Sequence, residues 1–329
     1  MKIGPHEHES RVVLAPMAGV TDRPYRDLCR GLGTHWAVSE MLTSDQRLWH
    51  TKKSQQRLKF QDETGPRWIQ VAGGDAETVA SAAAAAAELG ADIVDINMGC
   101  PAKKVCNKAA GSALLRDPEL VQAIFQAVTQ RVDVPVTVKI RLGWSLDEVN
   151  ATQVARMAEN AGISLVTVHG RSRACKFKGN VHYDRIAEVV EAVQIPVVAN
   201  GDISSEGEAL CVLEQTGAAA VMVGRAAQGR PWLPGQIDFF LKNKNFKKNP
   251  PSGEIKQILT THVSQLADFY GEVMGPRIAR KHVGWYLADP SNDRKMELRS
   301  FNRLETLDEQ LEAIEMIFQT EAAGNTEAA

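Results

Sequence analysis

Residues 93–101 are Ile-Val-Asp-Ile-Asn-Met-Gly-Cys-Pro, and this stretch decides how the rest of the chain is interpreted. A mostly apolar, β-branched run, typical of a buried strand, leads directly into Asn97, a glycine and Cys100, which Pro101 follows at once. Polar and reactive side chains held at the end of a rigid strand are typical of a catalytic loop. The alternative is a strand-to-helix turn with a small buried cysteine, since free cysteines are usually buried and inert. The other predicted strands separate the two interpretations.

Eight short runs rich in β-branched residues recur along the chain, with helical segments between them. They lie at 12–15, 36–39, 68–71, 93–96, 136–140, 165–168, 196–199 and 220–223. Most are continuously apolar, as parallel strands covered by helices should be. Eight such strands with right-handed crossovers predict a (β/α)8 TIM barrel. An open doubly wound sheet is the alternative, weakened because no G-x-G-x-x-G follows the first strand.

The composition is that of an ordinary globular protein, with 44% hydrophobic and 24% charged residues in 329. No apolar run reaches the ~18 residues that a membrane helix needs, and the first residues lack the apolar stretch of a signal peptide. Five irregularly spaced cysteines argue against a disulfide framework and favour a cytoplasmic location. The net charge of −2 excludes a uniformly basic surface, so a nucleic acid would have to bind local basic patches.

The character of the sequence changes after residue 225. Four prolines between residues 229 and 253 are typical of a linker, and from 254 to 318 the pattern is helical only. We expect a barrel over 1–240, a C-terminal helical domain over 241–320 and a disordered tail over 321–329.

Every predicted strand carries polar or otherwise special residues at its C-terminal end, where the chemistry of a TIM barrel gathers. In chain order these are Pro16, Met17 and Ala18; Glu40 and Met41; Gln70; Asn97 and Cys100; Lys139 and Arg141; His169 and Arg171; Asn200, Gly201 and Asp202; and Gly224 and Arg225. Any one of them could be a satisfied loop residue. Their shared location indicates one site.

The last two strand ends indicate a phosphate site. Glycines at 201 and 224 expose backbone N–H groups, an arginine follows at 225, and the loops after strands seven and eight commonly bind phosphate in TIM barrels. A monophosphate cofactor fits better than a dinucleotide. Lys139, at the end of an apolar strand, needs an anionic partner such as a reduced flavin ring, or else a lowered pKa. A Schiff-base lysine is the alternative.

Five motifs, in their order and spacing, resemble the tRNA-dihydrouridine synthases. They are Met-Gly-Cys-Pro-Ala-Lys-Lys-Val at 98–105, Val-Lys-Ile-Arg at 138–141, His-Gly-Arg at 169–171, Ala-Asn-Gly-Asp at 199–202 and Val-Gly-Arg at 223–225. The resemblance spans roughly residues 10 to 318. The motifs at 16–24, 229–232 and 277–282 are most similar to the bacterial B-type members.

The resemblance implies an FMN enzyme that reduces the C5–C6 bond of a uridine in tRNA, with electrons from NADPH or NADH. For the B-type it implies a D-loop uridine, at position 17. Pro16, Met17 and Ala18 would then pass beneath the flavin, Gln70 and Lys139 would hold its pyrimidine edge, and His169 would lie near it. The ribityl chain and phosphate would be bound by Asn200, Gly201, Asp202, Gly224 and Arg225.

The resemblance also makes Cys100 the proton donor. Hydride passes from flavin N5 to C6 of the uracil, and C5 then needs a proton from the opposite face. A thiol with an ordinary pKa near ~8.5 is mostly protonated at neutral pH and can be that acid. We therefore expect that Cys100 lacks a strongly electropositive neighbour. Asn97, Arg141 and Arg171 are candidates for binding the uracil, and Cys106 is expected to be a packing residue.

The target uridine must be extruded from its neighbours, so the protein must bind the shape and phosphates around it. Arg277, Arg280 and Lys281 fall on adjacent turns of one predicted helix face, and we expect them to contact tRNA. The lysines of 242–248 are more typical of a solvated face. We expect a monomer that binds tRNA and neither a membrane nor a metal.

Two other functions remain open from the sequence. A flavin barrel that acts on a free pyrimidine, like dihydroorotate dehydrogenase, would not need the helical domain and its arginines. An RNA-binding barrel that has lost catalysis would be colourless when purified. The intact Cys100, Lys139, His169 and phosphate loop argue against this last possibility.

Overall fold

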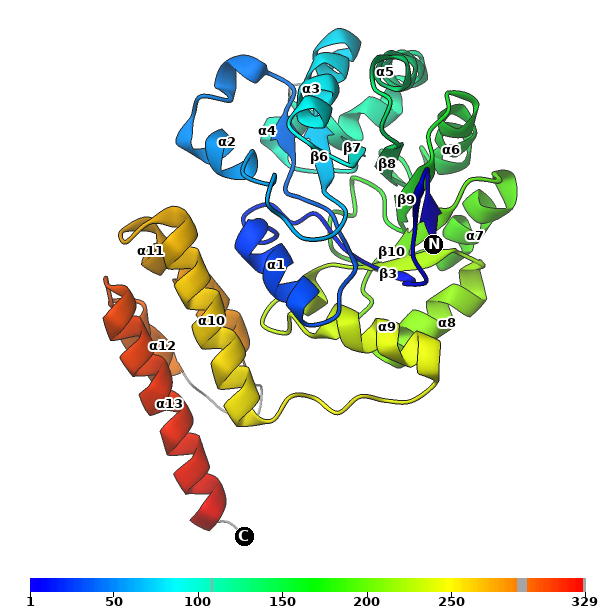
Figure 1. Ribbon diagram of the computed structural model, residues 1–329. Helices are drawn as coiled ribbons and strands as arrows, with labels where there is room; N and C mark the ends of the chain where they lie inside the picture. The colour runs from blue at the N-terminus through cyan, green and yellow to red at the C-terminus, as the bar shows by residue number, and fades with distance from the viewer. Residues whose placement is uncertain (108, 289–294, 328–329) are drawn as a thin grey trace. The chain divides into compact units, whose positions relative to one another are not determined.

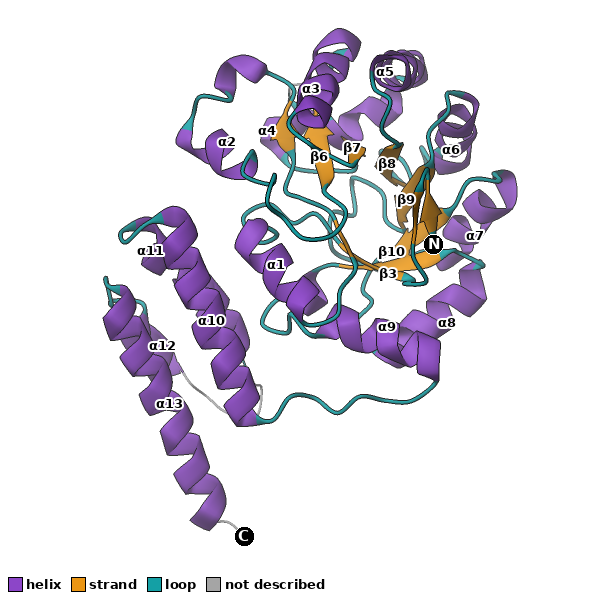
Figure 2. Cartoon of the chain, viewed as in Figure 1, coloured by secondary structure: helices purple, strands orange, loops and turns teal. Residues whose placement is uncertain are grey.

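The computed structural model describes residues 1–107, 109–288 and 295–327, and its larger part is a parallel barrel surrounded by helices (Figures 1 and 2). The strands lie in the order β4-β3-β11-β10-β9-β8-β7-β6-β5. Their bounds are β3 (Val12–Leu14), β4 (Trp36–Ala37), β5 (Leu42–Thr43), β6 (Trp68–Ala72), β7 (Ile93–Met98), β8 (Val136–Arg141), β9 (Leu165–His169), β10 (Val197–Asn200) and β11 (Ala220–Val223). All eight predicted strands are present.

The barrel closes beside β4. Val38, directly after β4, forms a parallel bridge with Trp68, and the Ser39 N–H donates to the Trp68 carbonyl at 2.9 Å. Further along the same segment, β5 pairs with the other end of β6, where Leu42 lies opposite Val71. β4 and β5 thus share one strand position, interrupted at residues 38–41. The predicted (β/α)8 barrel is confirmed.

Helices follow the strands around the barrel. They are α1 (Arg23–Gly31), α2 (Lys52–Arg57), α3 (Ala76–Glu88), α4 (Lys103–Cys106), α5 (Pro118–Arg131), α6 (Ala151–Asn160), α7 (Tyr183–Ala192), α8 (Glu206–Thr216) and α9 (Leu233–Asn243). Short 3-10 turns add η1 (Gln46–Leu48), η2 (Gly111–Arg116) and η3 (Arg225–Ala227). The carboxylates of Asp75 and Asp117 accept the N–H groups of Thr78 and Leu120, which caps α3 and α5. Small alanines on α3 allow it to pack closely against α5.

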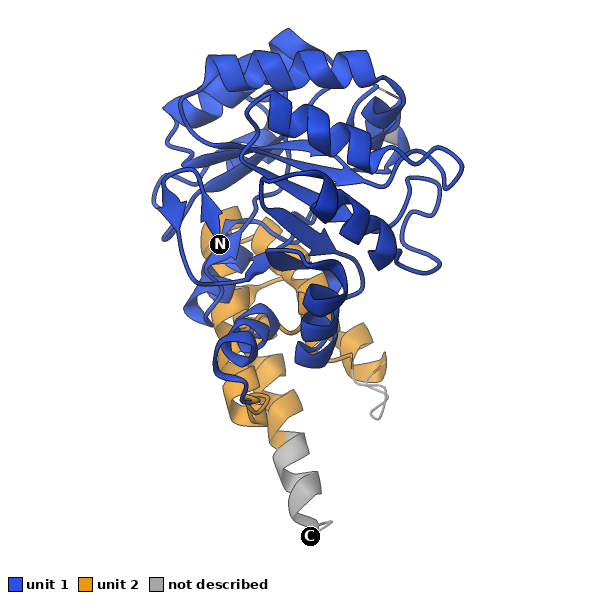
Figure 3. Cartoon of the chain, turned by 90° about the vertical axis from the view of Figure 1, so that its right-hand side faces the viewer, with its two compact units in different colours: residues 1–226, 232–245 blue, residues 227–231, 246–329 orange. Residues whose placement is uncertain are grey.

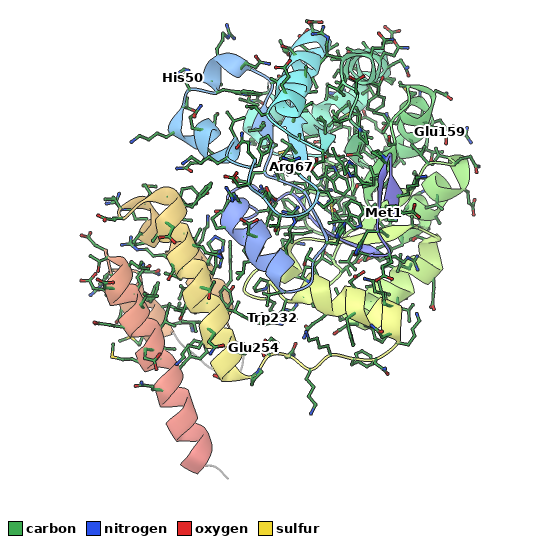
Figure 4. All side chains as sticks on the ribbon, viewed as in Figure 1. Met1, His50, Arg67, Glu159, Trp232 and Glu254 are labelled. Carbon is green, nitrogen blue, oxygen red and sulfur yellow. The ribbon has the colours of Figure 1, made fainter. Side chains whose placement is uncertain are left out.

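The N-terminal end of the barrel is filled with apolar side chains. A short hairpin of β1 (Lys2–Ile3) and β2 (His6–Glu7) contributes Ile3 to a buried cluster that includes Trp36, Trp68, Ile93 and Leu165. The last four are the first residues of their strands. Side chains crowd the barrel interior (Figure 4). Because the strand starts hold the apolar core, the polar residues at the strand ends lie at the opposite mouth.

The chain divides into two compact units, shown separately in Figure 3. The first comprises residues 1–226 and 232–245, so α9 belongs with the barrel. The second comprises 227–231 and 246–329. Gly229 explains why 227–231 groups with the helices: a Cβ there would lie 2.3 Å from the Trp285 carbonyl oxygen, so only glycine allows this approach.

The second unit is helical, with α10 (Ser252–Tyr270), α11 (Met274–Tyr286), α12 (Lys295–Phe301) and α13 (Leu307–Glu327). Its core contains Leu259, Leu266 and Val283, with Ile314 of α13. The segment predicted as a disordered tail, 321–329, lies within α13 as far as Glu327, and its last two residues fall outside the described residues. Within the described ranges, no helix combines the length and apolar character required to cross a membrane.

Candidate active site

The structure brings the predicted residues together at the C-terminal ends of the barrel strands. Parallel pairing places Asn97 of β7 opposite Lys139 of β8, and Arg141 of β8 opposite His169 of β9. His169 in turn lies opposite Asn200 of β10. Four adjacent strands therefore deliver an amide, a lysine, an imidazole and a second amide to one mouth.

A buried hydrogen-bond network underlies the catalytic loop. Gln70 Nε2 donates to Asp95 Oδ2 at 2.7 Å, and Asn97 Nδ2 donates to Gln70 Oε1 at 2.7 Å. Asn97 Oδ1 accepts the Cys100 N–H at 3.0 Å. The other carboxylate oxygen of Asp95 accepts the Thr137 hydroxyl at 2.6 Å. The sequence motifs assign no role to Asp95, although an acidic residue inside an apolar strand is a signal, since a buried charge needs partners.

Cys100 is half-buried, and its backbone is held at both ends. Its N–H donates to Asn97, and its carbonyl accepts the Ser112 hydroxyl at 2.9 Å and the Ser112 N–H at 3.1 Å. Gly111 has a positive φ of 64°, and a Cβ there would lie 2.8 Å from the Cys100 carbonyl oxygen. Cys106 Sγ lies 3.6 Å from the same oxygen, so this second thiol packs against the loop.

Arg141 fastens the catalytic loop to the loop after β9. Its Nε donates to the Gly99 carbonyl at 2.7 Å, and its Nη1 donates to the carbonyls of Ser172 and Lys176 at 3.0 and 2.7 Å. Burial lowers the pKa of Arg141 to about 10, which leaves it charged at neutral pH. The guanidinium interacts electrostatically with Cys100, as does Lys139. The expectation that Cys100 lacks an electropositive neighbour is therefore wrong, because β8 places both basic residues beside the loop that follows β7.

Lys139 is half-buried, and among the described residues its ammonium has one hydrogen-bond acceptor, an amide oxygen. Its Nζ donates to Asn200 Oδ1 at 2.9 Å, and Asn200 Nδ2 donates to the Met222 carbonyl at 2.8 Å, which fixes the direction of that amide. Burial, and then the charge of Arg141, lower the pKa of Lys139 to about 7. An anion bound beside this lysine would favour its charged form.

His169 presents a buried nitrogen to the mouth of the barrel. The residue is 8% exposed, and within the part of the chain that the structure describes its Nε2 has no hydrogen-bond partner. Burial first, then the charges of Lys139 and Arg141, hold its pKa well below the ordinary value, so the imidazole is neutral. A buried ring nitrogen without a protein partner is suited to a polar group of a bound molecule.

The predicted phosphate loops meet at Asp202. Its carboxylate accepts from Arg171 and, at 2.8 Å, from Arg225 Nη2. Asp202 has a positive φ of 44°, and Gly201 beside it has a φ of 142°, where a Cβ would lie 2.7 Å from Val181. Because the carboxylate is committed to two arginines, only the backbone of this residue and the exposed Arg225 are suited to an anion.

Most hydrogen-bond donors of the Arg171 guanidinium are bound to acceptors of the protein itself. Four of its five N–H groups donate, two to the Gly179 carbonyl and two to Asp202. The residue is 2% exposed. Its position therefore orders the loop after β9 and the neighbouring Asp202.

The segment after β3 forms the remaining wall of the mouth. Pro16 and Met17 are half-buried and Ala18 is exposed. The Met17 N–H donates to the Thr21 hydroxyl at 2.8 Å, and the Met17 side chain packs on the barrel core. The backbone hydrogen bond and the side-chain packing together hold this segment in place.

The basic residues of α11 differ from one another within the helical unit. Arg277 and Lys281 are exposed, whereas Arg280 is half-buried and donates through Nη2 to the Leu304 carbonyl at 2.7 Å. Lys242, in the barrel unit, is paired with Asp238 at 2.9 Å and Glu9 at 3.1 Å. Over the described ranges, no group of three or more His, Cys, Asp or Glu residues could hold a metal ion.

A family model described as dihydrouridine synthase (Dus) matches residues 13–323. The chain belongs to the dihydrouridine synthase family. A Pseudomonas aeruginosa protein called tRNA-dihydrouridine synthase B is 54% identical over 318 residues, which cover 97% of this chain and 96% of that protein. Proteins with the same name from Pseudomonas syringae and Vibrio parahaemolyticus are 52% and 49% identical, over 98% of this chain and 96% and 100% of theirs. This dihydrouridine synthase is thus a flavin-dependent oxidoreductase, and the resemblance seen in its motifs is confirmed.

Proposed function

We propose that this dihydrouridine synthase reduces the C5–C6 bond of a tRNA uridine to give 5,6-dihydrouridine, with FMN as its flavin and NADPH or NADH as the electron source. The observation that carries the proposal is the fixed Cys100 loop, which lies beside Lys139 on the neighbouring strand, with His169 one strand further. The names of the relatives support tRNA as the substrate. The B-type likeness supports a D-loop uridine, at position 17.

The residues present fit FMN. His169 Nε2 has no partner among the described residues, and the Lys139 ammonium uses one of its three N–H groups, so both are suited to the polar edge of the flavin ring, with Gln70 nearby. The backbone at Asn200, Gly201 and Asp202, with Gly224 and Arg225, is suited to the ribityl chain and phosphate. Pro16, Met17 and Ala18 would provide the surface beneath the ring. When bound, FMN supplies hydride to C6 of the uracil.

Cys100 holds the proton for C5 on the face of the base opposite the flavin. Its loop is anchored through Asn97, Ser112 and the Arg141–Gly99 contact, so the thiol is kept in one place while a base enters. Lys139 carries only a partial charge at neutral pH before the cofactor binds, because its pKa is about 7. A reduced, negatively charged flavin beside Lys139 would partly neutralise the positive charge that this lysine otherwise exerts on the Cys100 thiol.

Asn97, Arg141 and Arg171 remain our proposed contacts to the uracil. Asn97 Nδ2 has two hydrogens, of which one goes to Gln70, and Arg141 has donors beyond its three carbonyl contacts. Arg171 has one N–H group left. All three therefore offer donors, which is what the carbonyl oxygens of uracil require.

The helical unit is proposed to bind tRNA through Arg277, Arg280 and Lys281. Exposure supports this role best for Arg277 and Lys281, since Arg280 also holds Leu304. We propose a monomer that acts in the cytoplasm. The cysteines support a reducing compartment, because they form no disulfide among the described residues.

The test is the Cys100→Ala variant, with the exposed Cys211→Ala as its control. The purified variant should keep its yellow flavin and lose turnover on tRNA by at least ~100-fold, the usual contribution of a general acid. Dihydrouridine is measured in tRNA taken from a strain that lacks this gene. Full activity of Cys100→Ala would remove Cys100 from the mechanism, and a colourless wild-type protein would favour an inactive RNA-binding barrel.

A further inference from the structure

The carboxylate of Asp95 lies beneath the active site and takes no part in the chemistry proposed above. Asp95 is 2% exposed and sits in β7, two residues before Asn97, so the two side chains project from the same face of the strand. It is linked to Cys100 by three successive hydrogen bonds: from Gln70 to Asp95, from Asn97 to Gln70, and from the Cys100 N–H to Asn97. We call these three bonds the Asp95 relay.

The direction of the Asp95 relay follows from the chemistry of its first member. An ionised carboxylate only accepts hydrogen bonds, so Gln70 must turn its Nε2 toward Asp95. The Gln70 oxygen then faces Asn97, which must donate to it through Nδ2. Asn97 Oδ1 is thereby left to accept the Cys100 N–H. If the relay ran the other way, Asn97 would point an N–H group at the N–H of Cys100.

The second carboxylate oxygen is fixed as well. It accepts the Thr137 hydroxyl at 2.6 Å, and that hydroxyl accepts the Trp68 Nε1–H at 2.9 Å. The hydroxyl has one proton, which it gives to Asp95. Burial raises the pKa of Asp95 to about 6, and its bonds from Thr137 and Gln70 and the charge of Lys139 act in the opposite sense. Asp95 is therefore ionised at neutral pH, where it can only accept.

We propose that Asp95 is a positioning residue for Cys100, which acts through Gln70 and Asn97 by fixing the direction of both amides. The inference rests on the proposed role of Cys100 as proton donor. With this direction fixed, the second N–H of Asn97 also stays a donor, and a donor suits the carbonyl oxygens of uracil. Asparagine at position 95 would remove this constraint, because its amide can either accept from or donate to Gln70.

The two half-reactions of the enzyme separate this role from a general loss of structure. In the first, NADPH reduces the bound flavin, and Cys100 is not needed. In the second, unmodified tRNA reoxidises the flavin, and the proton of Cys100 is needed. Asp95→Asn should keep its FMN content and its rate of reduction by NADPH within about 2-fold, whereas reoxidation by tRNA should slow by at least ~10-fold, because a misplaced acid transfers its proton poorly.

A solvent isotope effect provides a readout that a structural defect would not change. When proton transfer limits reoxidation, the ratio of the rates in H2O and D2O should be larger for Asp95→Asn than for the wild type. Asp92→Asn is the matched control. It makes the same change at a half-buried aspartate just before β7, whose carboxylate binds Arg67 and lies outside the relay. Both rates of this control should match the wild type.

Reoxidation of Asp95→Asn at the wild-type rate, with an unchanged isotope effect, would overturn the inference and leave the proposed function intact. A wild-type enzyme whose reduced flavin is not reoxidised by tRNA would refute the proposed function, and the inference with it. If Asp95→Asn does not fold, Gln70→Met breaks the relay in its middle and leaves the bond between Asp95 and Thr137. Because Gln70 also lies at the proposed flavin edge, its reoxidation rate per bound FMN should fall by more than its rate of reduction by NADPH. An equal fall in both rates, or a normal reoxidation rate, would count against the relay.

Discussion

Replacement of Lys139 by methionine should remove the pH dependence of FMN binding. Methionine keeps the length of the side chain and loses its charge. In the protein without flavin, burial and then Arg141 lower the pKa of Lys139 from 10.5 to about 7, and Nζ donates to Asn200. The N1–C2=O2 edge of the oxidised flavin accepts hydrogen bonds, and such an acceptor favours the charged lysine. FMN binding should therefore take up a proton above neutral pH, and the affinity should fall as the pH rises.

The size of the effect follows from that pKa. If FMN binds only the protonated lysine, its Kd is proportional to 1 + 10^(pH − pKa). With a pKa of about 7, the Kd should rise ~50-fold from pH 7 to pH 9, which corresponds to about 2.3 kcal/mol. The phosphate of FMN has its second pKa near ~6 and so contributes little to this change.

The same shift predicts the stability of the flavin-free protein. Between pH 7 and 10.5 the unfolded chain binds more protons at Lys139 than the folded chain does. The free energy of unfolding should therefore rise with pH in this window, and Lys139→Met should remove that part of the rise.

Quenching of FMN fluorescence, titrated with flavin-free protein at pH 7, 8 and 9, measures the Kd. Lys139→Met should bind FMN more weakly at pH 7, with a nearly constant Kd across the series. Lys242→Met, which removes a lysine paired with Asp238 and Glu9, should keep the wild-type slope. A wild-type Kd that stays within about 3-fold from pH 7 to pH 9 would refute the reasoning, as would a Lys139→Met variant with the full slope.

Three further substitutions test the helical unit and the catalytic loop. Arg277→Ala should raise the KM for tRNA and lower the salt slope of binding by about 1, with FMN content unchanged. Arg280→Ala should have the same effects and should also lower the Tm, because it leaves the Leu304 carbonyl without its donor. Equal Tm values in the two variants would argue against that structural role. Gly111→Ala should lower the free energy of unfolding by about 1–3 kcal/mol, because alanine is strained at the positive φ of this position. It should also slow turnover, because the new Cβ would lie 2.8 Å from the Cys100 carbonyl oxygen. A variant with both wild-type stability and wild-type turnover would contradict this.

The barrel could be predicted because its strands are buried on both faces and therefore read as continuous apolar runs. The strand ends could be predicted for the same reason, since Lys139 and His169 interrupt such runs at their ends. The shared position of β4 and β5 could not, because it depends on the bridge between Val38 and Trp68. No local pattern in the sequence predicts that pairing.

The hydrogen-bond partners of the site were the harder part. Asp95 and Gln70 are 25 residues apart, and Thr137 is 42 residues from Asp95, so no sequence spacing links them. The register of β7 on β8 places Arg141 near Cys100, and this overturned the expected absence of a basic neighbour. The sequence does not distinguish Arg280 from Arg277 and Lys281, because its hydrogen bond to the Leu304 carbonyl depends on how the helices pack.

Single-turnover reoxidation tests the central claim, proton donation by Cys100, most directly. Wild-type enzyme and Cys100→Ala are reduced under anaerobic conditions and mixed with unmodified tRNA, and the return of the flavin absorbance is followed. The wild-type flavin should be reoxidised with formation of dihydrouridine, whereas that of Cys100→Ala should stay reduced at least ~100-fold longer. Equal rates in the two proteins, with equal dihydrouridine, would contradict the account.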